Sequence, residues 1–158
     1  MSIRILVTSV LFATLVMSGT LPSAALADMT ETAPAANAED RDFVAGQRAV
    51  QDKKWSEAVE RFKKVVARDP KNADAFNMLG YASRWLGRMD ESFAAYDRAL
   101  ALEPNHRGAH EYIGVAYLRV GKLAKAEEHL AKLKVICGVG CEEYRDLARA
   151  IAEHKAKK

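Results

Sequence analysis

The chain has 158 residues, of which 49% are hydrophobic and 28% are charged. This length accommodates one domain, and the composition excludes both general disorder and a membrane protein with several spanning helices. The net charge is +3, but lysine and arginine alternate with aspartate and glutamate along the sequence, so no basic stripe indicates a nucleic-acid partner.

The first 27 residues have the layout of a secretory signal peptide. Arg4 supplies a positive charge, an apolar run follows from Ile5 to Met17, and small residues end the segment at Ala27. The apolar run is too short to cross about 30 Å of hydrocarbon comfortably. We therefore expect cleavage after Ala27, no stable membrane insertion of the mature chain, and export to the bacterial periplasm.

The segment 28–38 is rich in alanine, threonine and glutamate and has no periodic apolar face. Such a segment buries too little apolar surface to offset the entropy lost on ordering. We predict that it is a disordered leader with no function beyond spacing.

The rest of the chain shows the periodicity of amphipathic helices joined by short turns. The clearest pair lies between Asn72 and Pro104, where a break at Gly87 and Arg88 separates two periodic segments. Gly80 stands inside the first of them at a cost of roughly 1 kcal/mol relative to alanine, which close approach of the second helix would explain. The predicted helices are 41–52, 55–68, 73–86, 89–102, 107–120, 123–136 and 142–156.

Eight spaced positions of this hairpin carry a recurring pattern, namely Phe76, Leu79, Gly80, Ser83, Ser92, Tyr96, Ala99 and Pro104. The pattern resembles that of a tetratricopeptide repeat, with the two serines as departures. It returns in both directions at the family's period of about 34 residues, as Gly46 and Gly114 illustrate. The resemblance implies an all-α fold, a right-handed α-solenoid of three helical hairpins at 39–72, 73–106 and 107–140.

One further period reaches Tyr144, Leu147 and Ile151, the apolar positions of a first helix that has no partner helix after it. A stacked array needs its terminal apolar face covered. We therefore predict that 141–158 forms a C-terminal solvating helix, which caps the array, and a basic tail.

In tetratricopeptide proteins the first helices of successive repeats line a concave groove that binds a peptide or a helix. The resemblance places these residues in or near the groove: Phe43, Gln47, Val50, Asn77, Tyr81, Arg84, Glu111, Val115 and Leu118. We expect Asn77, Tyr81 and Arg84 to face outward, while Trp85 either rims the groove or covers a turn. The carboxylate clamp of some family members is not matched, because Phe43, Gln47, Asn77, Gly108 and Tyr112 stand roughly at its positions.

Cys137 and Cys141 flank two glycines between the third hairpin and the last helix. In an exported protein this pair indicates a disulfide that links the third hairpin to the C-terminal solvating helix. A redox-active thiol pair and soft copper binding by the thiols remain alternatives. His106, His110, His129 and His154 show no pair at ligand spacing, so the sequence predicts no other metal site.

The sequence contains no phosphate-binding loop, zinc-protease motif or nucleophile with an adjacent base, so we predict no catalytic residue and no cofactor. The leading hypothesis is a non-catalytic adaptor, monomeric or weakly oligomeric, whose groove holds a segment of another envelope protein. Two alternatives stay open, a thiol-redox or copper-handling protein that uses the cysteines and a homo-oligomeric assembly unit.

Overall fold

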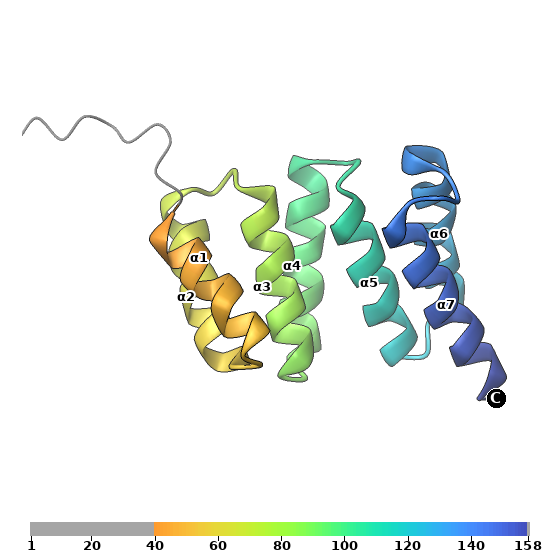
Figure 1. The fold of residues 1–158 in the computed structure, drawn as a ribbon, viewed down its shortest axis with the longest axis horizontal. Helices are drawn as coiled ribbons and strands as arrows, with labels where there is room; N and C mark the ends of the chain where they lie inside the picture. Colours follow the sequence, from red (N-terminus) through yellow and green to blue (C-terminus); the bar gives the residue numbers. More distant parts are fainter. Residues whose placement is uncertain (1–39, 158) are drawn as a thin grey trace, which may run out of the picture. The chain divides into compact units, whose positions relative to one another are not determined.

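The computed structural model describes residues 40–157, and these residues contain seven α-helices and no strand (Figure 1). Each predicted helix is present, and its ends differ from the predicted ones by at most one residue. The predicted signal peptide and leader lie outside the described residues. The helices are α1 (Arg41–Gln51), α2 (Trp55–Arg68), α3 (Ala73–Trp85), α4 (Met89–Leu102), α5 (Arg107–Arg119), α6 (Leu123–Cys137) and α7 (Glu142–Ala156).

Side chains that accept hydrogen bonds from free backbone N–H groups fix the starts of α3 and α5. The Oδ1 atom of Asn72 accepts a hydrogen bond from the N–H of Ala75 at 2.8 Å. His106 has the same place before α5, and its Nδ1 atom accepts from the N–H of Ala109 at 3.2 Å. Because that atom accepts, the proton of the neutral His106 ring lies on Nε2, which donates to Asp74 at 3.1 Å.

The turns inside the three hairpins use one backbone conformation. Gly87 has φ 75° and Gly121 has φ 73°, values in the left-handed region that favours glycine. The first hairpin has Lys53 at the corresponding position, with φ 56°. The turn geometry therefore repeats even where the sequence does not supply the favoured residue.

The helices pack in two rows (Figure 1). Each hairpin packs within itself, as α1 on α2, α3 on α4 and α5 on α6. The odd-numbered helices also contact one another in succession, α1 with α3, α3 with α5 and α5 with α7. This is the arrangement of an α-solenoid, in which the first helices of the repeats form a continuous face. No helix in 40–157 combines the length and the apolar character needed to cross a membrane.

Gly80 permits the close approach that the sequence suggested. A Cβ atom at this position would lie 2.7 Å from the ring of Tyr96 on α4, and one at Gly46 would lie 2.8 Å from the ring of Phe62 on α2. In the third hairpin the neighbour is different, because a Cβ atom at Gly114 would lie 2.6 Å from Leu147 of α7. The last helix therefore docks into the space that the repeat glycine leaves open.

Helix α7 buries one apolar stripe against the third hairpin. Leu147 and Ile151 lie in a cluster with Leu118 of α5 and Leu133 of α6. On its polar side, Lys155 forms an ion pair with Glu127 of α6. The helix thus has one face in the apolar core and another that carries charge, as a terminal helix of a stacked array requires.

Candidate functional site

A groove of about 460 Å³ lies between α3, α5 and α7. Helix α7 supplies one of its walls, so the terminal helix takes part in the groove as well as covering the array. The lining residues are Tyr81, Arg84 and Trp85 from α3, Glu111, Tyr112, Val115 and Arg119 from α5, and Asp146, Arg149, Ala150 and Glu153 from α7.

Four residues that the sequence placed in the groove line this cavity, namely Tyr81, Arg84, Glu111 and Val115. The other predicted groove residues lie elsewhere. Phe43 meets the ring of Phe62 edge to face at 5.7 Å between centroids, and Val50 packs on the same apolar cluster. Leu118 is buried beneath α7. Gln47 is half-buried on α1 and does not line the cavity.

The expectation that Asn77 faces outward is wrong. Its side chain is 5% exposed, and its Nδ2 atom lies 3.2 Å from where a Cβ atom of Gly108 would be. The glycine at position 108 lets α5 approach so closely that Asn77 is enclosed between the two helices. Asn77 therefore packs between repeats and does not line the cavity.

The outward exposure expected of Arg84 is also wrong, because only 4% of the residue is exposed. Its guanidinium carbon lies 5.1 Å from the ring centroid of Tyr81 and 5.5 Å from that of Trp85. Tyr81 lies three residues before Arg84 on the same helix, and Trp85 lies one residue after it. Together with Tyr96 of α4, these rings cover the guanidinium group. The Nε atom of Arg84 has no hydrogen-bond partner in the described part of the chain.

A series of aromatic rings runs across the mouth of the groove. Trp55 of α2 stacks on Trp85 with 5.2 Å between centroids and 9° between planes. Tyr81 lies 4.8 Å from Tyr112 of α5. The guanidinium carbon of Arg119 lies 4.7 Å from the Trp85 ring. Trp85 is 44% exposed, so it forms the rim of the groove and resolves the choice that the sequence left open.

Sequence reasoning missed Arg119 and the α7 wall as groove residues. The repeat period contained the signal, because Arg119 lies one period after Trp85 and Glu153 lies one further period on. Arg149 stands in the same way one period after Val115. Extending the groove positions into the last half repeat would have found these residues.

The charges along the groove are unevenly paired. Arg149 forms an ion pair with Asp146 at 2.6 Å. Burial, helped by the carboxylates of Asp146 and Glu143 and opposed by the Arg84 guanidinium, raises the pKa of the Glu111 carboxyl to about 7. Burial, together with Glu111, raises the pKa of Tyr112 to about 12. The groove therefore has a basic and aromatic centre at Arg84 and an acidic side at Glu111.

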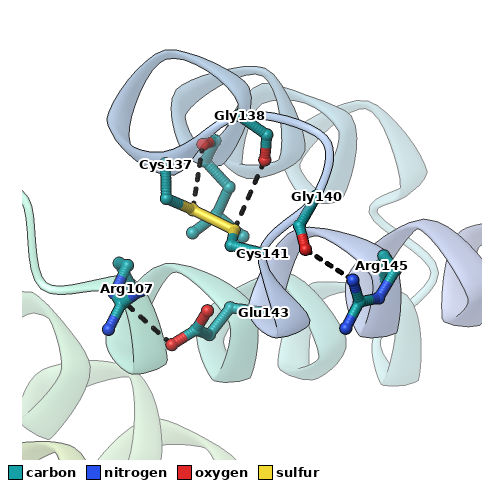
Figure 2. The surroundings of a disulfide bond; sticks show 8 residues. Arg107, Cys137, Gly138, Gly140, Cys141, Glu143 and Arg145 are labelled. Carbon is teal, nitrogen blue, oxygen red and sulfur yellow. Dashed lines mark hydrogen bonds and ion pairs between the residues drawn. A yellow bond between two sulfur atoms is a disulfide. The ribbon is translucent and has the colours of Figure 1, made fainter.

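The structure joins Cys137 and Cys141 by a disulfide between the end of α6 and the start of α7 (Figure 2). Their Cα atoms are 5.9 Å apart, and the loop between them contains Gly138 at φ 76°. Glu143 lies close by, with a carboxylate oxygen within 4.8 Å of both sulfur atoms, and pairs with Arg107 at 3.5 Å. The loop is thus held both covalently and by an ion pair to α5.

His110 and His129 form a buried pair that the sequence spacing did not indicate. Their Nδ1 atoms are 2.8 Å apart, and Nε2 of His110 lies 2.9 Å from the carbonyl oxygen of Pro104. A carbonyl oxygen only accepts, so His110 carries its proton on Nε2, and His129 must donate from Nδ1. Burial, helped by the neighbouring His110 and Lys132, lowers the pKa of His129 to about 4. Both rings are therefore neutral at physiological pH.

The sequence of this chain matches the family described as tetratricopeptide repeat over residues 43–106 and 86–138. Superkiller protein 3 of Saccharomyces cerevisiae is 26% identical over 90 residues, which are 57% of this chain and 6% of that protein. The chain therefore spans a small fraction of this relative's length.

Two solved structures share the fold. The TPR2B domain of yeast Sti1, solved as a pHsp70 complex, has a TM-score of 0.66 and 19% identity, and the match covers 74% of this chain and 95% of that one. PcrH in complex with the chaperone binding region of PopD has a TM-score of 0.63 and 22% identity, and the match covers 73% of this chain and 86% of the PcrH chain. The family match covers more than half of the sequence, and the chain therefore belongs to the tetratricopeptide repeat family.

Proposed function

We propose that this protein is a non-catalytic adaptor that binds a segment of another protein in the groove between α3, α5 and α7. The observation that carries this proposal is the composition of the groove, in which the exposed Trp85 ring and two half-buried tyrosines stand beside Arg84, a buried cation without an ion-pair partner in the described chain. Aromatic residues and arginine are the side chains that dominate binding energy at protein interfaces.

The structural neighbours support the same proposal. Sti1 and PcrH were each solved with a segment of another protein, and this chain has the fold of both. A groove lined by the first helices of successive repeats offers an extended surface, and its ligand would be a peptide or a helix. The low identity carries no information on which segment this chain binds.

Site-specific photo-crosslinking from native cells tests the proposal. A benzoylphenylalanine at Val115, inside the groove, should crosslink to a discrete partner, whereas the same residue at Ala94, exposed on α4, should not. Tyr81→Ala should abolish the crosslink, because it removes an aromatic ring from the groove. Equal crosslinking from both positions, or a crosslink that survives loss of Tyr81, would contradict binding in this groove.

We further propose that the protein works in the periplasm after cleavage behind Ala27. The support is the sequence of residues 1–27, with a basic start, an apolar run and small residues at the end. N-terminal sequencing of the native protein should begin at Asp28, and osmotic shock should release the protein. A native chain that keeps its first residues, or one found only with cytoplasmic markers, would contradict export.

A second candidate function rests on the cysteine loop. If Cys137 and Cys141 are reduced, their sulfur atoms and the Glu143 carboxylate lie close enough to bind one metal ion, with copper as the soft metal that thiolates prefer. Thiol titration of native protein and copper analysis separate this function from that of an adaptor.

We propose that the isolated protein is monomeric or weakly oligomeric, which sedimentation measures directly.

A further inference from the structure

Arg84 is a buried cation with no anion beside it. Only 4% of the residue is exposed, and within residues 40–157 no carboxylate oxygen lies within 4.0 Å of its guanidinium nitrogens. Its Nε atom donates no hydrogen bond. Burial of a charge is unfavourable unless an opposite charge and hydrogen-bond acceptors compensate for the lost water. The described chain supplies only part of that compensation, through the nearby Tyr96 hydroxyl and the more distant Glu111 carboxylate, although Arg84 lines the groove.

We propose that the missing partner of Arg84 is the side-chain carboxylate of an aspartate or glutamate in the bound segment. This inference rests on the proposed function, because it specifies the chemistry of the segment that the groove holds. An arginine fork matches the geometry of a carboxylate and donates two parallel hydrogen bonds to it.

The rings beside Arg84 define where the carboxylate can bind. Tyr81 and Trp85 lie 5.1 Å and 5.5 Å from its guanidinium carbon, and aromatic faces stabilise a cation without accepting its in-plane hydrogen bonds. The donors of the fork therefore remain available at the edge of the guanidinium. Access to these donors requires the exposed Trp85 ring to shift from its stacked position on Trp55.

A second arginine strengthens the attraction for an anion. Arg119 of α5 lies against the Trp85 ring, at 4.7 Å from its centroid, and its Nη1 atom donates to the carbonyl oxygen of Arg84 at 3.3 Å. Both guanidinium groups thus lie against the same indole ring. A carboxylate between them reduces the repulsion of the two like charges.

The chain's own carboxylates do not take this role. Asp146 is already paired with Arg149 on α7. Glu111 lies in the groove but outside ion-pair distance of Arg84, and its burial favours the protonated form up to about neutral pH. Among residues 40–157 Arg84 therefore has no ion-pair partner, and the groove carboxylates Glu111 and Glu153 stay beyond ion-pair distance of it.

Selection from a random twelve-residue peptide library displayed on phage tests this inference. The purified protein, Arg84→Met and Arg98→Met are panned in parallel. Arg98 is a matched control, because it is an exposed arginine on α4 whose guanidinium also lies over an aromatic ring, that of Phe76, outside the groove. Binding of the selected peptides is then measured through the fluorescence of the two tryptophans, which stack at the groove.

The expected result is that peptides from the wild type and from Arg98→Met share an acidic residue that peptides from Arg84→Met lack. Replacing that residue by its amide should weaken binding to the wild type about tenfold and leave binding to Arg84→Met unchanged, the signature of a direct pair. Arg84→Lys, which keeps the charge, should retain the acidic preference. If Arg84→Met does not fold, Arg84→Gln removes the charge in the same comparison.

The other outcomes separate this inference from the proposed function. Peptides that bind the groove without an acidic preference, or with the same preference in Arg84→Met, overturn the role of Arg84 and leave the adaptor in place. A library that yields no groove-dependent binder overturns both.

Discussion

Lys53 holds in the first hairpin the left-handed turn position that Gly87 holds in the second. The two residues are one repeat period apart, with φ 56° and φ 75°. A side chain costs about 1 kcal/mol or more in this conformation, while glycine costs nothing there in the folded state. The first hairpin therefore carries a local strain that the other two hairpins avoid.

Lys53→Gly should accordingly stabilise the protein. We expect a gain of about 0.5–1 kcal/mol in the free energy of unfolding, since the relief of strain exceeds the added entropy of the unfolded chain. Lys53 is exposed, so the change removes no packing. Urea denaturation measures the effect, with Gly87→Ala as the reverse control, which should destabilise by a similar amount. A loss of stability in Lys53→Gly would show that the turn is not strained.

Glu111→Gln should raise stability at pH 8 and leave it nearly unchanged at pH 5. Because burial raises the folded-state pKa to about 7, the folded chain binds more protons than the unfolded chain between about pH 4.5 and 7. Stability contributed by this group therefore falls as the pH rises through that range. Glutamine removes the loss, which we place on the order of 1–2 kcal/mol after allowing for partial exposure. Equal unfolding midpoints of variant and wild type at pH 8 would contradict it.

The same carboxyl should make binding pH-dependent. An acidic segment at Arg84 should bind more weakly at pH 8 than at pH 6, because ionised Glu111 then faces the groove together with Asp146, Glu143 and Glu142. Glu111→Gln should flatten this dependence, and the groove-binding peptides provide the measurement by tryptophan fluorescence. Binding that strengthens with pH would mean that Glu111 contacts a cation of the ligand.

The buried histidine pair should destabilise the fold in acid. The folded-state pKa of His129, about 4, lies below the ordinary value of 6.5, so the unfolded chain binds more protons between these values and stability falls as the pH drops through them. At about 1.4 kcal/mol per pKa unit the loss is on the order of 3 kcal/mol. His129→Phe keeps the ring that packs near Tyr117 and should give a shallower slope of stability against pH. NMR that shows either ring titrating near pH 6.5 in the intact fold would exclude this account.

Oxidation of the cysteine pair should matter for stability and not for binding. We expect non-reducing mass spectrometry of the native protein to show Cys137 and Cys141 linked, and Cys137→Ser to lower the melting temperature, since closing so short a loop contributes roughly 2 kcal/mol. Peptide binding should persist, because neither cysteine lines the groove. Free thiols in native material, or lost binding at unchanged stability, would favour the redox or copper function instead.

The helices could be predicted from the sequence because their signals are local. The apolar period, the glycines at 87 and 121 and the prolines after the first two hairpins marked most helix ends, and each predicted end lies within one residue of the observed one. The groove was harder, because its lining depends on which side chains other repeats cover. Asn77 and Arg84 stand at outward positions of α3 but are enclosed, one by the approach of α5 at Gly108 and the other by the rings of Tyr81 and Trp85.

Contacts between distant parts of the chain were also beyond the sequence. The histidine pair joins residues 19 positions apart on α5 and α6, and no spacing rule for ligands covers that distance. Helix α7 was predicted as a cover, yet its role as a groove wall follows only from its packing beside α5. Both features depend on how the last hairpin meets the terminal helix.

The position of α7 beside α5 makes the length of the groove adjustable by design. Helix α7 occupies the place of a first helix in a fourth repeat. One more hairpin inserted between the end of α6 and the start of α7 would therefore move α7 outward by one repeat. Asp146 and Glu153 of α7 would then lie farther from Glu111. The position of the terminal helix therefore determines where the groove ends, and an inserted repeat would lengthen the groove between Trp85 and α7.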